Sequence, residues 1–277
     1  MKTMWKGAIS FGLVSIPVRV YPATEEKTLR FNQLHEEDNG RIRYKRTCQK
    51  CGKEVEFSEI VKGYEYDKDH YVVMTDEDFD AVPLESSRTI DIERFVDLDS
   101  IDPIYYQKSY YLAPEETGVK AYHLLTQALE QGGKVGVAKV SFRGKEHLAS
   151  IRLRGGALVL ETMYWPDEIR EPAFDELKKT VKVKPQEVKM AESLIQNLSE
   201  AWDPAAFTDE YREALVKIVD KKVAGEEIEV IETEEAPKVV DLMDALKQSV
   251  EQTKKLARKK PAKKTAARAP RKKAAAG

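Results

Sequence analysis

Short runs of alternating polar and apolar residues dominate the first 225 positions. Such runs predict strands where β-branched and aromatic residues alternate with polar ones, over 9–21, 70–74, 88–96, 105–112, 134–142, 147–154 and 157–164. Gly12 and Pro17 interrupt the first run, which favours an edge-type or bent strand. Turns at 143–145 and 155–156 separate the last three strands. Short strands with tight turns are typical of an antiparallel meander or a barrel.

Helices are predicted where apolar residues recur every three or four positions. The segments are 117–131, ended by Gly132 and Gly133, then 184–198 and 208–223. A short helix capped by Thr75 is expected to end near Pro83. The pattern therefore predicts a mainly β protein with α-helices, in which a core over 1–225 is closed by helices within 184–224.

The last 52 residues change character. Residues 226–235 contain six glutamates and no basic residue, so 226–237 is predicted to be an acidic linker. Apolar residues at 239, 242, 243, 246 and 250 then form a helical stripe, within a predicted short helix over 238–253. The stripe favours docking in a partner's groove over packing on the chain's own core, because a short helix is marginal alone.

Charge separates the body of the chain from its end. The formal net charge is −2, yet residues 254–277 hold eleven basic residues and no acid, whereas the first 253 hold 35 basic against 48 acidic ones. This composition predicts a disordered basic tail, and the asymmetry indicates a polyanionic partner.

Several classes of protein are not favoured. No apolar run is long enough for a transmembrane helix, and 1–22 lacks the apolar segment of a secretory signal, so a cytoplasmic protein without membrane contact is expected. No nucleotide-binding, zincin or serine-hydrolase motif occurs, and nothing argues for an enzyme. The thirteen carboxylates within 65–102 follow no metal-binding order and are interpreted as a solvated acidic face.

The only cysteines form a Cys48-x-x-Cys51-Gly52 knuckle between segments 41–46 and 53–57, which are predicted to pair as a hairpin. Structural zinc needs four ligands, and this pair supplies two. A second subunit's pair, or His35 with another group, would have to complete a zinc site. A reduced turn without metal is favoured, and no cofactor is expected to be required.

Two clusters of cations lie in predicted strands. The first comprises Arg41, Arg43, Lys45 and Arg46, where alternate residues of an extended strand are spaced about 6.6 Å apart, the order of phosphate spacing. The second includes Lys139, Arg143, Lys145 and Arg152. Either could be one solvated strand face. Together with the tail they favour sequence-independent, salt-dependent contact with nucleic-acid phosphates.

The chain resembles bacterial Ku, the DNA-end-binding family of non-homologous end joining. The resemblance lies in Met4 to Val18 (MWKGAISFGLVSIPV), in Gly40 to Tyr44, in Gly63 to Tyr66 and in Val239 to Leu246. It covers essentially the whole chain. It implies a Ku-core β-barrel with an extended bridge arm centred on 40–57, C-terminal helices and a disordered basic tail.

The resemblance also implies a function. Members form ring-shaped homodimers that thread onto duplex ends and recruit the end-joining ligase, DNA ligase D. The expected DNA contacts are Arg41, Arg43, Lys45, Arg46, Lys139, Arg143, Lys145, Arg152, Lys254, Lys255, Arg258, Lys259, Lys260, Lys263 and Lys264. The expected ligase contacts are Val239, Leu242, Met243 and Leu246. A nucleoid-associated protein follows. The alternatives are an architectural DNA-binding protein driven by its tail, and a zinc-dependent nucleic-acid enzyme using the 65–102 carboxylates.

Overall fold

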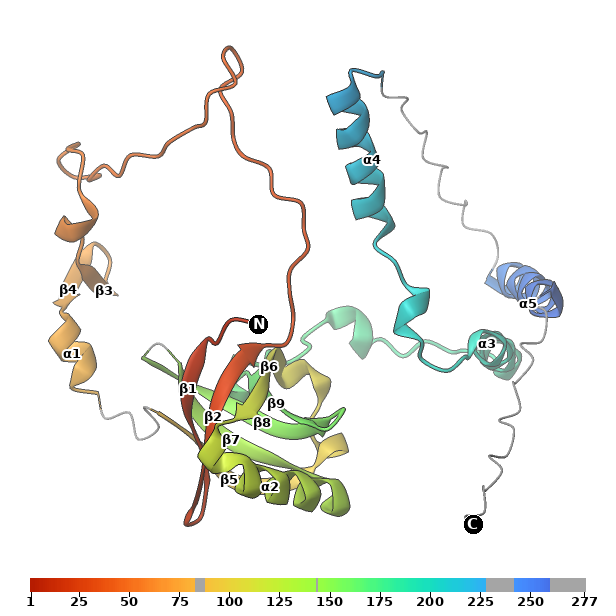
Figure 1. The fold of residues 1–277 in the computed structure, drawn as a ribbon. Coiled ribbons are helices and arrows are strands. Elements are labelled where there is room, and N and C mark those ends of the chain that lie inside the picture. Colours follow the sequence, from red (N-terminus) through yellow and green to blue (C-terminus); the bar gives the residue numbers. More distant parts are fainter. Residues whose placement is uncertain (83–87, 143, 228–241, 260–277) are drawn as a thin grey trace, which may run out of the picture. The chain divides into compact units, whose positions relative to one another are not determined.

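The structure is a computed structural model that describes residues 1–82, 88–142, 144–227 and 242–259 (Figure 1). It divides into two compact units, Met1–Pro172 and Ala173–Gly277. The helices between 184 and 224 bury none of their residues, and their predicted role in closing a core over 1–225 stays a prediction.

A closed barrel forms the centre of the first unit. Its strands follow the order β1-β2-β6-β9-β8-β7-β5. Their bounds are Trp5–Phe11 (β1), Val14–Pro22 (β2), Tyr106–Pro114 (β6), Ala157–Met163 (β9), Lys145–Arg154 (β8), Lys134–Phe142 (β7) and Thr89–Asp97 (β5). Neighbours are antiparallel except for the short parallel pairing of β5 with β1, which closes the ring. The predicted barrel and the last three strands are confirmed.

The barrel interior is filled by alternate residues of its strands. Fully buried side chains include Ile9, Val18, Ile90, Val140, Ile151 and Leu160. Helix α2 (Val119–Gly132) packs Tyr122, Leu125 and Leu129 into the same core. The Tyr122 hydroxyl donates to the Leu112 carbonyl (2.7 Å) and accepts from the Leu158 amide (2.8 Å), which ties α2 to two strands. Gly133, with φ of 60°, ends the helix as predicted.

Of the two alternatives for 9–21, an edge-type or a bent strand, the edge type is wrong, because β1 and β2 each have two neighbours in the barrel. Pro17 is tolerated because the β2–β6 ladder begins only at Val18. The Pro17 carbonyl instead accepts from the Glu115 amide at 2.9 Å, beyond the end of β6. No ladder bond therefore needs the N–H that proline lacks.

An insertion between β2 and β5, residues 23–88, is here called the arm. It contains β3 (Lys62–Asp67), β4 (His70–Met74) and α1 (Asp76–Asp80), which begins at the predicted N-cap Thr75. The hairpin predicted over 41–57 is reduced to isolated bridges, Leu34 with Arg41 and Thr47 with Glu54. None of the residues over 41–57 is buried, so no packing against a core supports a longer ladder here.

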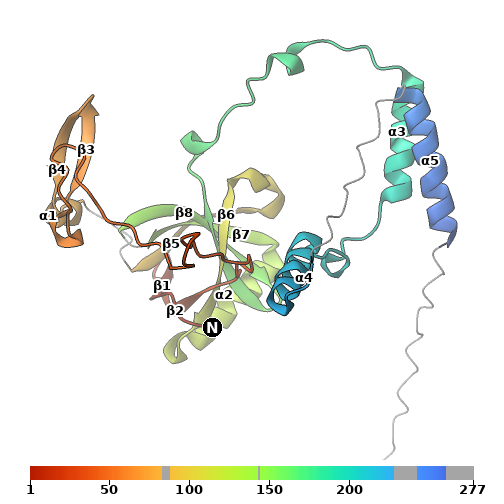
Figure 2. The same cartoon turned by 90° about the horizontal axis from the view of Figure 1, so that it is seen from above.

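The second unit holds helices α3 (Pro185–Leu198), α4 (Glu210–Ala224) and α5 (Leu242–Lys259). α5 lies along α3 (Figure 2). Residues 254–259 were predicted to begin a disordered tail, but α5 continues through them. Lysine, leucine, alanine and arginine favour helix, and cations are stabilised at a helix C-terminus. Within the described ranges, no helix combines the length and apolar character that crossing a bilayer requires.

Candidate nucleic-acid interface

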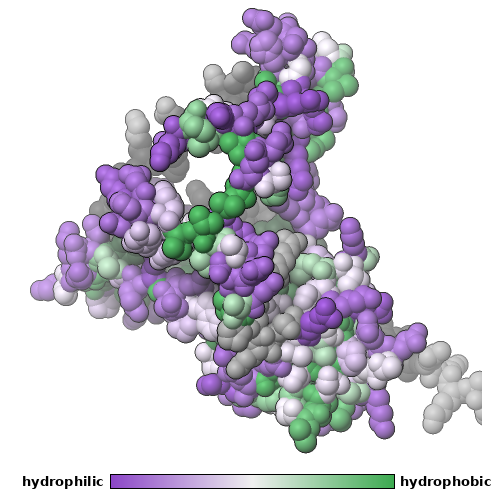
Figure 3. Space-filling view, turned by 90° about the vertical axis from the view of Figure 1, so that its left-hand side faces the viewer, coloured by the Kyte–Doolittle hydropathy of each residue, from purple (hydrophilic) through white to green (hydrophobic). Residues whose placement is uncertain are grey.

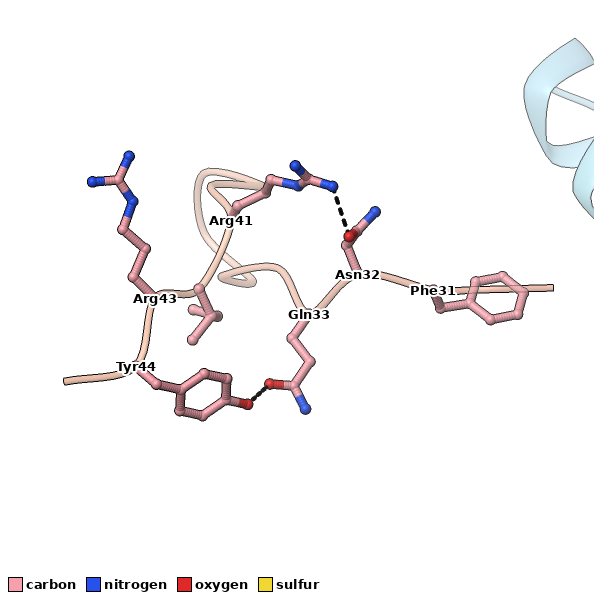
Figure 4. A pocket seen from close by; sticks show the side chains of 7 residues that line it. Phe31, Asn32, Gln33, Arg41, Arg43 and Tyr44 are labelled. Atoms are coloured by element: carbon pink, nitrogen blue, oxygen red, sulfur yellow. Dashed lines mark hydrogen bonds between the residues drawn. The ribbon is translucent and has the colours of Figure 1, made fainter. Parts of the chain in front are cut away.

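The arm holds the first predicted cation cluster on exposed, irregular chain. The Arg41 guanidinium donates to the side-chain oxygen of Asn32 at 2.7 Å (Figure 4). The Lys45 ammonium lies 2.8 Å from a carboxylate oxygen of Glu54. Arg46 lies over the ring of Phe57, 5.4 Å from its centroid. All of these cations are exposed, and Arg43 is free of ion pairs within the described chain.

Part of the second predicted cluster, to which Lys134 and Arg154 also belong, is paired with acids on neighbouring strands. Lys139 on β7 lies 2.9 Å from Glu93 on β5, and Lys134 lies 2.6 Å from Asp97. Both acids belong to the segment that we interpreted as a solvated acidic face, so part of that segment instead pairs with β7. Lys145 and Arg154 remain exposed at the ends of β8, and Arg143 lies outside the described residues.

Arg152 forms a bidentate pair across two strands. Its Nε and Nη2 donate to the two carboxylate oxygens of Glu161 at 2.8 and 2.7 Å, and one of these oxygens also accepts from Ser109 at 3.1 Å. The two side chains are 24% and 9% exposed. The predicted phosphate contact of Arg152 therefore competes with a largely buried carboxylate.

The pKa of Glu161 reflects this setting. Burial would raise the pKa of the carboxyl, but the hydrogen bonds and charge of Arg152, helped by Ser109, outweigh it and hold the pKa below its ordinary value. The pKa of Arg152 is raised in turn, chiefly by its hydrogen bonds to Glu161. The pair therefore stays ionised and stabilises the barrel wall.

The cysteine knuckle is a tight turn closed by backbone hydrogen bonds. The Cys48 amide donates to the Lys53 carbonyl and the Gly52 amide to the Cys48 carbonyl, both at 2.8 Å, while Gly52 adopts φ of 71°. Hydrogen bonds from the backbone and side chain of Cys51 and from the backbone of Lys50 lower the pKa of the Cys48 thiol. Within the described ranges, no cluster of three or more metal-ligating side chains occurs, and His35 instead bonds Asp38. Whether Cys48 and Cys51 bind zinc is therefore not decided by this geometry, and the reduced turn without metal stays a prediction.

The C-terminal residues are placed only in part. Met243 and Leu246 are half-buried on α5, which packs against α3 rather than standing detached. Lys254, Lys255, Arg258 and Lys259 lie in the last turns of α5. Val239, Lys260, Lys263 and Lys264 lie outside the described residues, as does the side chain of Leu242.

A set of side chains that we did not predict surrounds the first cluster. Phe31, Asn32, Gln33, Ile42 and Tyr44 line an open hollow together with Arg41 and Arg43 (Figure 4). The available signal was the interleaving of aromatic residues with arginines over 30–46. Many other apolar side chains of the arm and of the second unit are also exposed, and Figure 3 shows hydrophobic residues among hydrophilic ones on one face.

Comparison with known proteins gives one consistent family. Residues 10–190 match the family model described as the Ku70/Ku80 beta-barrel domain. The chain is 50% identical over 251 residues to "Non-homologous end joining protein Ku" of Frankia casuarinae, covering 90% of this chain and 63% of that protein. Proteins of the same name from Desulfitobacterium hafniense and Archaeoglobus fulgidus are 49% and 44% identical, over 91% and 92% of this chain and 88% and 100% of their own lengths.

Proposed function

Because the chain belongs to the Ku family, we propose that it binds the ends of double-stranded DNA without reading sequence, as a ring-shaped homodimer that threads onto the duplex. The names of its relatives place those proteins in non-homologous end joining. The observation that carries the proposal is the arm, an insertion into the barrel with exposed cations from Arg41 to Arg46 and no buried residue among those described.

A threaded ring accounts for how an acidic body can bind DNA. The chain outside 254–277 has 35 basic against 48 acidic residues, so an open surface of average composition would repel a duplex. A ring needs positive charge only on its inner wall. Because Lys and Arg side chains contact phosphates, such a ring binds any sequence and loses affinity steeply with salt. The role is that of a non-enzymatic scaffold.

The segment over 238–253 is proposed to recruit a DNA ligase. Its apolar residues Met243 and Leu246 are half-buried on α5, which packs against α3, so the same stripe can serve a partner's groove once α5 moves. Leu246→Glu should abolish stimulation of DNA ligase D and leave DNA binding unchanged, as measured by ligation and gel-shift assays with the same protein. A parallel loss of DNA binding would mean that the stripe belongs to the fold.

The ring is tested by comparing DNA that has ends with DNA that has none. A gel-shift series at fixed salt compares a linear duplex with a covalently closed circle of the same sequence. The linear form should be bound by several proteins and the closed circle by none. Equal binding to both would overturn the ring and favour an architectural protein driven by its tail. Metal-dependent strand cleavage by the pure protein would instead support the nuclease alternative.

A deletion in the basic tail tests whether the tail or the ring selects DNA ends. Deleting 260–277, which leaves α5 intact, should weaken affinity and reduce its salt dependence because seven cations are lost. The preference for linear over closed DNA should remain. If that preference vanished, the tail rather than the ring would select ends.

A further inference from the structure

Residues 31–44 fold back on themselves to build a small, cross-linked loop in the arm. The Ile42 amide donates to the Gln33 carbonyl at 3.1 Å, and the His35 amide donates to the Gly40 carbonyl at 2.8 Å. Asp38 closes the turn by accepting from the Gly40 amide at 2.8 Å. These bonds hold the two legs of the loop side by side without a hydrophobic core.

Side chains cross-link the legs and border an open hollow of about 670 Å³. Arg41 binds Asn32, and the Tyr44 hydroxyl donates to the side-chain oxygen of Gln33 (Figure 4). Arg41 and Arg43 extend away from the Tyr44 ring, so ring and guanidiniums border the hollow from different sides. The hollow is therefore lined by aromatic, amide and guanidinium groups.

Both aromatic rings of the loop are left for a ligand. Phe31 is 68% exposed and Tyr44 is 79% exposed. Neither ring stacks on another aromatic side chain among the residues that the structure describes. Phosphate binding requires only the two arginines, so the two exposed rings and the two amides beside them are available for another part of a ligand. Rings stack on base faces, amides bond base edges and guanidiniums bind phosphate.

We propose that this hollow accepts an unpaired nucleotide at a DNA end, with its base stacked on Tyr44 and its phosphate bound by Arg41 or Arg43. Inside a duplex the base faces are covered by their neighbours, and at a blunt end only the outer face of the last base pair is open. An unpaired nucleotide offers both faces and its base edge, which suits a ring and amides together. The inference rests on the proposed end binding and adds a ligand class, a single-stranded overhang.

Full-length protein and matched DNA test this site. Binding is measured by fluorescence anisotropy on a blunt duplex and on the same duplex carrying a single-stranded 3′ overhang. Tyr44→Leu removes the ring but keeps apolar bulk, and Tyr44→Phe keeps the ring without the hydroxyl. Tyr211→Leu is the control, because Tyr211 is 78% exposed on α4 and lies outside the arm.

The wild-type protein and Tyr44→Phe should bind the overhang duplex more tightly than the blunt one. Tyr44→Leu should weaken overhang binding about 5- to 50-fold and leave blunt binding unchanged, as expected for one lost base stack. A 2-aminopurine in the overhang should be quenched by the wild-type protein and not by Tyr44→Leu. Tyr211→Leu should behave like the wild type.

Other outcomes identify what failed. Equal loss on both duplexes, with a change in sedimentation, would show that Tyr44 holds two copies together and would overturn the site. Unchanged overhang binding in Tyr44→Leu, or no overhang advantage in the wild type, would overturn it while blunt-end binding preserves the proposed function. Absence of binding to any linear duplex would remove the proposed function itself.

Discussion

The barrel and the arm of the same unit are stabilised in opposite ways. Every barrel strand contributes side chains to one closed core, and Ile9, Val18 and Leu160 are fully buried. None of the described residues from 23 to 82 is buried. The arm is held instead by local hydrogen bonds, such as the capping box between Thr75 and Asp78. The difference shows that hydrophobic burial is concentrated in the barrel, whereas the arm leaves its rings and cations exposed.

The largest effect should come from the barrel core. Ile151→Ala removes a fully buried side chain and should lower the free energy of unfolding by about 2–5 kcal/mol. The matched change in the arm is Ile60→Ala, at a side chain 48% exposed, with an expected change within about 0.5 kcal/mol. Urea denaturation followed by circular dichroism measures both. Comparable losses would contradict the division between the two regions.

The next effect concerns the charged pair in the barrel wall. Glu161→Gln leaves Arg152 without a carboxylate and should lower stability at neutral pH by roughly 1–3 kcal/mol. Because the pKa of Glu161 is lowered on folding, its stabilisation is present above the ordinary glutamate pKa and is lost as pH falls through the folded pKa.

The pH dependence gives a second readout for this pair. Between about pH 6 and pH 3, the free energy of unfolding should therefore fall less steeply with pH in Glu161→Gln than in the wild type. Glu54→Gln in the arm is the control, since Glu54 is paired with Lys45 at the surface and such pairs contribute little. An unchanged pH profile in Glu161→Gln would show that the pair does not remain ionised.

A smaller effect on DNA binding should distinguish Arg43, which forms no ion pair in the described chain, from Arg152, which is paired with Glu161. Arg43→Ala should weaken binding to all linear duplexes alike and reduce the slope of log affinity against log salt by about 1, with no loss of stability. Arg152→Ala should chiefly lower stability, because it leaves Glu161 unpaired in the wall. Salt titrations of anisotropy, paired with denaturation, separate the two. The reverse pattern would place DNA on the barrel wall instead of the arm.

The smallest effect is expected at the knuckle. Cys51→Ser should leave both unfolding and linear-duplex binding unchanged, because structural zinc needs four ligands and no group of three or more metal-ligating side chains occurs in the described part of the chain. Metal content per chain is measured alongside. A clear loss of stability together with bound zinc in the wild type would show that a second pair of cysteines completes a site.

Part of this architecture could be read from the amino-acid pattern alone. The strands over 134–163, helix α2 with its glycine stop and α1 with its cap depend on local periodicity and local capping, so neighbouring residues suffice to predict them. The resemblance to the family was equally local, since it rests on contiguous motifs. The cations of the arm were found because they crowd a few consecutive positions.

Tertiary structure decided what each cation faces and how each strand is used. Lys139 meets Glu93, and Arg152 meets Glu161, only because strand order and register bring β5, β7, β8 and β9 together. The same closure gave β1 and β2 two neighbours each, which excludes the edge type that was one of the two alternatives for 9–21. Charge and periodicity are properties of single residues and short windows, so the sequence determined the elements and the net asymmetry. Pairing is a property of residues far apart in the chain, and only folding could assign it.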